Sequence, residues 1–175
     1  GGVKKVGGTA LKGLIIGGAA AVGIMGASVK KFADFESAML DMKSVYDPSE
    51  IPDGLYKNMT DQAKQLGAST KFSAQEAAAG MKELAAAGMK PDQVMKAIAG
   101  TLDLAAAGEM EVAAASEIVS NGLNMFGMSA DKAGHFADVL AKAGALGSLS
   151  VQDMGNSLKY VGPVAAAAGW SLESV

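Results

Sequence analysis

The chain has 175 residues and a formal net charge of −3, which is enough polypeptide for one ordinary domain with a buried core. Half of the residues are hydrophobic but only 5% are aromatic, Ala is by far the commonest apolar residue and Met is frequent. This composition favours closely packed helices over a β-sandwich. The absence of Cys excludes disulfides and thiolate metal sites. All fifteen basic residues are Lys, and without Arg to read phosphates and guanine edges we expect no sequence-specific nucleic-acid binding.

Residues 1–31 form a Gly/Ala-rich hydrophobic segment with flanking Lys, and within it residues 13–29 carry no charge. Seventeen residues is the short end of a membrane span. Small residues recur four positions apart, which is the spacing of close helix contacts in membranes. These residues are Gly13, Gly17, Ala19 and Gly23. A spanning helix, a buried or lumen-facing helix, a flexible segment and a signal peptide stay open as interpretations.

A helical body is predicted for residues 32–175, and its first two helices precede any repeat. Their apolar residues recur at helical spacing. The first stripe comprises Phe32, Phe35, Met39, Met42 and Tyr46, and Asp47-Pro48 ends it. The second comprises Leu55, Met59, Ala63 and Leu66, and we expect Gly67 to end that helix.

From residue 70 onward the sequence repeats, with two kinds of helix start in alternation. One series has apolar anchors 38 and 39 residues apart, namely Phe72, Met110 and Leu149. The other has glycines 39 and 42 residues apart, namely Gly88, Gly127 and Gly169. Such a period predicts an all-α fold of short antiparallel helices in stacked helix–turn–helix repeats of about 40 residues.

Local signals set the predicted turns of these repeats. Ser73 and Glu76 have the spacing of a capping box, and Pro91 suits the first turn of a helix. Ser129, Ser150 and Ser171 can each cap the helix that follows. The three glycines lie where a helix ends and a left-handed residue is needed.

Each repeat helix also carries an apolar stripe, and stacked neighbours would bury it. The stripes are Val94, Ile98, Leu102 and Ala105; Val112, Ala115, Val119 and Phe126; Phe136, Leu140 and Ala143; and Val151, Met154, Leu158 and Val161.

The sequence offers little for catalysis, so we expect no enzyme, no cofactor and no metal site. The single His, His135, is interpreted as a surface or interface residue. Glu109 and Glu111 are interpreted as acids at a helix start, where they favour the helix dipole. Trp170 occupies the position of Met89 and Met128 in the other copies, which indicates a helix-entry or inter-repeat contact before a ligand anchor.

The ordered series of segments from residue 32 to residue 175 resembles the conserved domain of phage tail tape-measure proteins. The matching segments lie at 32–45, 66–94, 102–143 and 149–175, and include "LGASTKFSAQEAAAGMKELAAAGMKPDQV". The resemblance covers about four-fifths of the chain. Because the chain starts with Gly1 rather than Met and stops within a helix-like stretch, we expect it to be part of a longer protein.

The resemblance implies a structural module that acts in tail assembly, in length determination inside the tail tube and in genome ejection. It implies tail tube protein, tail tip or baseplate proteins and tail assembly chaperones as partners, with a homo-oligomer in the tube lumen. It implies location in the virion tail lumen, in the host cytoplasm during assembly and at the host envelope during ejection. The alternative is a membrane-active helical module that inserts through residues 13–29.

One property departs from the family pattern. Turns break the helices about every 20 residues, whereas a ruler would gain about 1.5 Å per residue from an uninterrupted helix. The chain is therefore interpreted as a compact module, and length determination is expected of the longer protein only.

Overall fold

The computed structural model describes residues 30–174, and within that range every regular element is a helix and none is a strand. The all-α prediction is therefore confirmed. Residues 30–43 are helical and are called the 30–43 helix below. The elements that follow are α2 (Asp53–Ser69), α3 (Ala74–Ala86), α4 (Pro91–Ala107), α5 (Val112–Met125), the 3₁₀ turn η1 (Ala130–Lys132), α6 (Ala133–Leu146), α7 (Val151–Ala167) and the 3₁₀ turn η2 (Leu172–Ser174).

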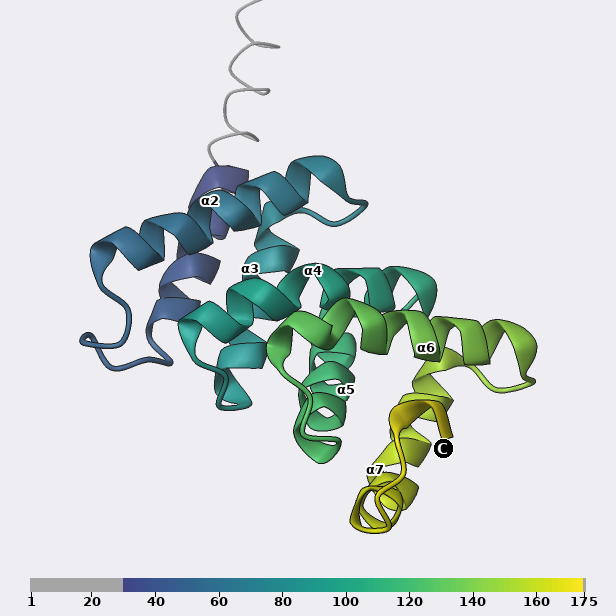
Figure 1. Ribbon diagram of the computed structural model, residues 1–175. Coiled ribbons are helices and arrows are strands. Elements are labelled where there is room, and N and C mark those ends of the chain that lie inside the picture. The colour runs from purple at the N-terminus through teal and green to yellow at the C-terminus, as the bar shows by residue number, and fades with distance from the viewer. Residues whose placement is uncertain (1–29, 175) are drawn as a thin grey trace, which may run out of the picture.

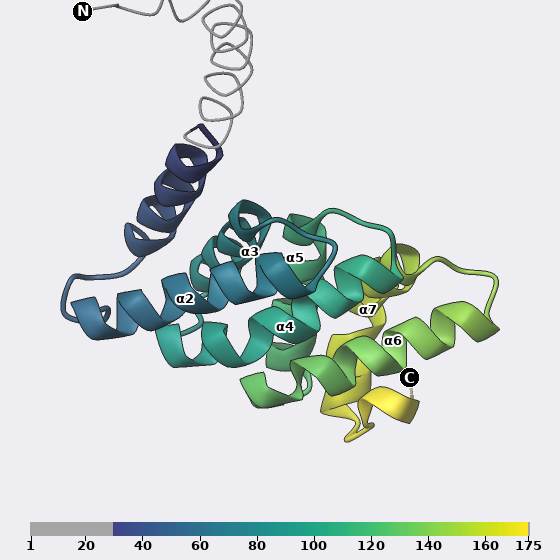
Figure 2. The same cartoon turned by 90° about the horizontal axis from the view of Figure 1, so that it is seen from above.

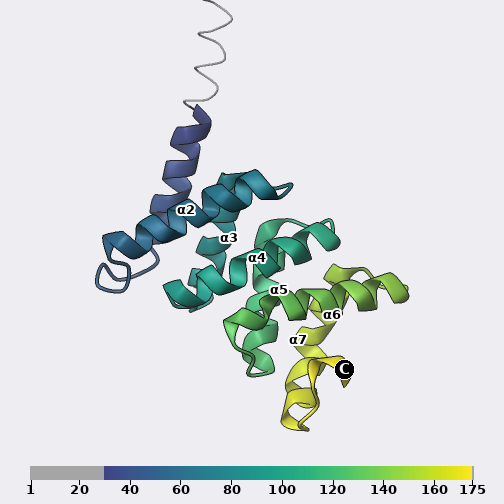
Figure 3. The ribbon, with the colours of Figure 1, turned by 45° about the horizontal axis from the view of Figure 1, so that its top comes forward.

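The helices after the 30–43 helix form two rows. In one row α4 packs against α2 and α6, and in the other α5 packs against α3 and α7 (Figure 2). Figure 1 shows the first row running across the view and the second running down it, and the elements advance in chain order from α2 to α7 (Figures 1 and 3). Consecutive helices thus cross one another instead of lying strictly antiparallel, because side-chain packing at the contacts sets the crossing angle.

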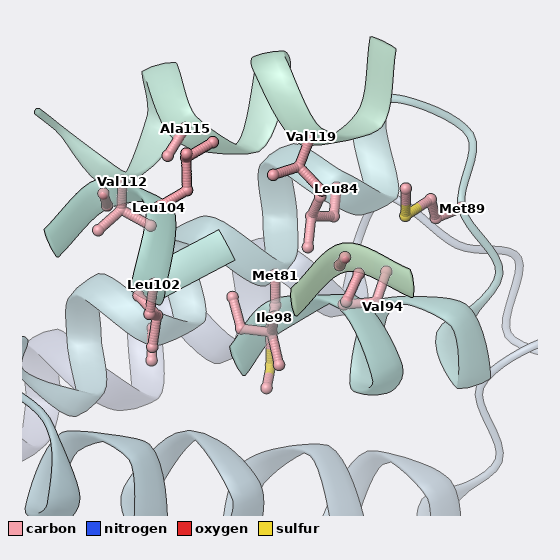
Figure 4. Close-up of a cluster of buried hydrophobic side chains, with 14 of the residues drawn as sticks. Met81, Leu84, Met89, Val94, Ile98, Leu102, Leu104, Val112, Ala115 and Val119 are labelled. Atoms are coloured by element: carbon pink, nitrogen blue, oxygen red, sulfur yellow. The ribbon is translucent and has the colours of Figure 1, made fainter. Parts of the chain in front are cut away.

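The core lies where the two rows meet. Figure 4 shows apolar side chains of α3, α4 and α5 packed together in this region. They include Met81, Leu84, Val94, Ile98 and Val119, none of which has any exposed surface. Burial of each such side chain contributes roughly 1.5–3 kcal/mol. The predicted stripe of α4 is confirmed, since all four of its members are buried.

Glycine permits the closest approach between neighbouring helices of one row. A Cβ on Gly100 of α4 would overlap the backbone of Ala133 and Gly134 in α6. The same holds between α5 and α7, where a Cβ on Gly155 would overlap the side chain of Ile118. Small residues therefore set the spacing of the rows.

Two predicted helix ends differ from the structure. Gly67 does not end α2, which continues to Ser69; instead a Cβ on Gly67 would overlap Ala74 at the start of α3. Glycine here permits a close contact, a role that looks the same in sequence as a helix stop. Tyr46 lies beyond the end of the 30–43 helix, and its hydroxyl donates to the carbonyl oxygen of Met89 at 2.8 Å.

The predicted Gly/Ala-rich segment falls almost entirely outside the described residues. Gly13, Gly17, Ala19 and Gly23 belong to that part, and so does the predicted membrane or helix contact of residues 13–29. Among residues 30–174, the helices are too short or too polar for a transmembrane span.

Candidate functional site

Three helix ends share one turn geometry, and each contains a predicted glycine. Gly88, Gly127 and Gly169 have φ values of 88°, 61° and 78°, in the left-handed region. The N–H that follows each glycine donates five residues back, as in Met89 to Leu84 at 3.2 Å. This is the Schellman motif, which pairs carbonyls that a helix end leaves free.

The sequence did not predict a fourth turn of this kind. Glu109 has φ 48°, and the Met110 N–H donates to the Ala105 carbonyl at 3.1 Å. Glu109 therefore lies past the C-terminus of α4, so its interpretation as an acid at a helix start was wrong. Glu111 is the N-cap residue of α5, but its side chain makes no capping hydrogen bond. The signal that could have revealed this turn is the Met that follows Glu109, as Met follows Gly88 and Gly127.

Serine caps mark two of the helix starts. The Glu76 N–H donates to Ser73 Oγ at 3.2 Å, and the Ser73 N–H donates back to Glu76 Oε2 at 2.7 Å. The Ser73 backbone N–H, and then its hydroxyl, lower the pKa of Glu76. At α7 the Asp153 N–H donates to Ser150 Oγ at 3.0 Å.

The prediction that Ser129 caps the helix that follows it was wrong. Ser129 precedes η1 in an extended conformation, but its side chain accepts no backbone N–H. The chain enters α6 through a 3₁₀ turn, in which the Lys132 N–H donates to the Ser129 carbonyl. The Ser129 hydroxyl instead hydrogen-bonds the Asp131 carboxylate and thereby lowers its pKa.

The residue three positions after each left-handed glycine is buried. Pro91 is the first residue of α4, Ala130 begins η1 and Leu172 begins η2. Each follows its turn at the same distance from Gly88, Gly127 or Gly169. The three turns therefore direct the chain back onto the preceding helices in the same way.

His135 of α6 contacts Glu173 of η2. The Nε2 to Oε1 distance is 2.7 Å, and both side chains are about half-exposed. The hydrogen bond from His135, then the backbone N–H of Glu173 and the Ser171 hydroxyl, lower the pKa of Glu173 to about 2. Because the two residues are 38 apart in the chain, sequence spacing gave no signal of this pair. Within the described residues, no group of three or more His and carboxylate side chains could hold a metal ion.

The end of the second row exposes an apolar surface, which we call the α7 face. Its members on α7 are Tyr160, Val161 and Val164. Three further apolar residues that precede or follow α7 in the chain are also exposed, namely Leu146, Leu149 and Trp170. Val161 is 52% exposed, so the prediction that its stripe is buried was wrong at this position. Trp170 is likewise exposed, although Met89 at the corresponding position is buried.

Next to this face, an apolar groove of about 290 Å³ runs between α6 and α7. Val139, Leu140 and Ala143 line it from α6, Met154 and Leu158 line it from α7, and Leu172 of η2 reaches it as well. The groove offers hydrocarbon surface and few polar groups, which suits a helix side chain better than a polar ligand.

These features define a class of protein: an all-α protein whose helices form two crossing rows, with capped turns and an apolar end face as its distinctive surfaces. Comparison with known proteins is consistent with that class. The profile of the family described as "Phage-related minor tail protein" matches residues 60–175. The chain is 42% identical over 171 residues to the "Tape measure protein" of Pneumococcus phage Dp-1, which is 95% of this chain and 15% of that protein.

A further relative is the "Probable tape measure protein" of Escherichia phage P2, which is 32% identical over 112 residues, or 64% of this chain and 14% of that protein. No solved structure matches the chain. The chain belongs to the phage tail tape-measure family of phage-related minor tail proteins. It spans about a seventh of the length of the curated relatives it matches.

Proposed function

We propose that the chain is a structural module of a tail tape-measure protein, located in the virion tail and acting in tail assembly. The observation that carries this proposal is the 42% identity to a tape measure protein along 95% of the chain. The proposed partners are the tail tube protein, the tail tip or baseplate proteins, the assembly chaperones and other copies of the chain in the tube lumen. Host cytoplasm during assembly and the host envelope during ejection are the other proposed locations.

The geometry supports a packed module over a measuring rod. The longest helices among α2 to α7 have 17 residues, or about 25 Å. Left-handed turns then return the chain onto the helices before it. A segment folded in this way gains little length per residue, so tail length would depend on other parts of the longer protein.

Deletion of one repeat in the longer protein tests this role. Residues 112–150 contain α5, α6 and the turn that follows them. In an extended helix these 39 residues would span about 58 Å. Under the proposal the deletion blocks tail assembly or leaves tail length unchanged, as measured by electron microscopy. Tails shortened by about that length would show instead that the segment measures.

Cross-linking tests the proposed location. The chain has no Cys, so Leu146→Cys, at the exposed last residue of α6, gives a unique attachment point. In intact particles we expect cross-links from this position to tail proteins. Absence of the chain from purified tails, or cross-links only to proteins outside the tail, would contradict the proposal.

A second candidate, insertion into the host membrane during genome ejection, rests on the seventeen uncharged residues at 13–29. Their length is at the short end for a span. Liposome association of the chain that disappears when residues 1–31 are deleted would support this candidate. Equal behaviour of both chains toward liposomes would contradict it.

A further inference from the structure

The α7 face lies opposite the surface that α7 already uses. Gly155 and Gly162 lie against Ile118 and Met125 of α5. At 100° per residue, Tyr160 and Val164 point to the other side of the helix. They are 83% and 71% exposed. One side of α7 is therefore packed, and on the other side Tyr160 and Val164 are open to solvent.

The neighbouring helix α5 has the same two sides, and both of them are covered. Val112 and Ser116 of α5 lie close to Gly80 of α3, and Ile118 lies against Gly155 of α7. An ion pair between Glu117 and Lys159, at 2.8 Å, also links α5 to α7. In this row α3 therefore lies on one side of α5, and α7 lies on the opposite side.

The first row continues in a corresponding way. Phe136 of α6 is completely buried, and its ring occupies the space next to Gly122 of α5. α6 therefore packs against both α4 and α5. The groove between α6 and α7 is the corresponding place one repeat later, and Leu172 of η2 is among the residues that line it.

The direction of η2 indicates where the occupant comes from. Leu172 follows the left-handed Gly169 just as Pro91 and Ala130 follow their glycines. Pro91 begins α4, and Ala130 begins η1, which leads directly into α6. The contact between His135 and Glu173 holds η2 on α6. A helix continued from η2 would start beside the groove, because Leu172 already lines it.

We propose that one further helical hairpin of the same polypeptide packs on the α7 face and in the adjoining groove. Its first helix continues from η2 along the groove between α6 and α7, and its second covers Tyr160 and Val164. The relatives support this source, since about six-sevenths of their length lies outside the matched region. The physical drive is burial of the apolar side chains that α7 leaves in water.

Cysteine reactivity in the longer polypeptide tests this assignment. Val164→Cys places a thiol on the α7 face, and Leu40→Cys is a control on the 30–43 helix, where the native side chain is 59% exposed. Both are surface positions, so neither substitution should prevent folding. The rate of maleimide labelling is measured at each site by mass spectrometry, in the 175-residue chain and in the longer polypeptide.

We expect Val164→Cys to react at least about tenfold more slowly in the longer polypeptide, because labelling then requires local opening. Leu40→Cys should react at the same rate in both. Equal rates for Val164→Cys in the two polypeptides would overturn the proposal. Protection in the 175-residue chain that grows with its concentration would assign the face to self-association and would also overturn it. Neither result depends on the role in the tail.

Discussion

Helices α5 and α7 begin at corresponding points of the repeat but differ in burial. α5 buries eight of its 14 residues, whereas α7 buries four of its 17. Both have apolar residues at helical spacing, so the difference comes from their surroundings. Within residues 30–174, α5 has packed neighbours on opposite sides, and α7 has a packed neighbour of its row on one side only. In a stacked fold, burial of a helix depends on the repeats next to it as much as on its own sequence.

The largest expected effect on the free energy of unfolding comes from comparing a buried aromatic ring with an exposed one. Phe136→Ala should lower the free energy of unfolding by about 4 kcal/mol, because it removes a fully buried ring and leaves a cavity. Tyr160→Ala on the α7 face should change it by less than about 0.5 kcal/mol. Urea unfolding followed by circular dichroism measures both. Equal losses would mean that α7 is packed on both sides in solution.

The next effect concerns the close approach of α4 and α6. Gly100→Ala should cost about 2 kcal/mol, since its Cβ would meet backbone atoms that cannot move aside. Gly134→Ala is the matched control, because a Cβ there has open space. It should raise the free energy of unfolding by about 0.5 kcal/mol, because Ala has a higher helix propensity than Gly. The same unfolding measurement applies. A neutral Gly100→Ala would contradict the described contact.

A smaller effect compares a glycine turn with the glutamate turn. Gly127→Ala should cost about 1 kcal/mol, because it places a side chain in the left-handed region. Glu109→Gly should raise the free energy of unfolding by about 0.5 kcal/mol. Glycine relieves the cost of the left-handed conformation, and part of that gain is offset by the entropy that glycine adds to the unfolded chain. Thermal unfolding checks that the two variants change the stability of the fold in opposite directions. Destabilisation by Glu109→Gly would show that this side chain has a further role.

The smallest effect is a titration at the open end of the fold. Because the folded pKa of Glu173 lies below its ordinary value of 4.5, its stabilising contact is fully present above that pH. The contact is lost as the pH falls through about 2. His135→Ala should raise the pKa of Glu173 toward its ordinary value, as read from the carboxyl carbon by NMR. Glu76, whose pKa depends on Ser73, is the internal control. An unchanged Glu173 pKa would mean that the contact with His135 does not form.

Local chemistry accounts for what the sequence predicted well. Gly88, Gly127 and Gly169 were found because glycine is the residue that a left-handed helix end favours. Ser73 and Glu76 were found because a capping box has a fixed spacing. The all-α class followed from the Ala-rich composition and the repeat period.

What sequence reasoning missed depends on packing contacts and backbone geometry that the local sequence does not specify. Gly67 was assigned to a helix end because nothing local reveals the contact with Ala74. Glu109 was missed because glutamate rarely adopts the left-handed conformation, and the Met that follows it was the only hint in the sequence. The exposure of Val161 could not be predicted, because it depends on whether another helix covers α7.

Native-state hydrogen exchange of the 175-residue chain tests the central claim, that a helix in this fold is stabilised by the neighbours on both of its sides. We predict that the backbone amides of α4 and α5 exchange only through global unfolding, and that those of α7 exchange much faster through local opening. Protection in α7 equal to that in α4 and α5, at a concentration where the chain is monomeric, would contradict the account.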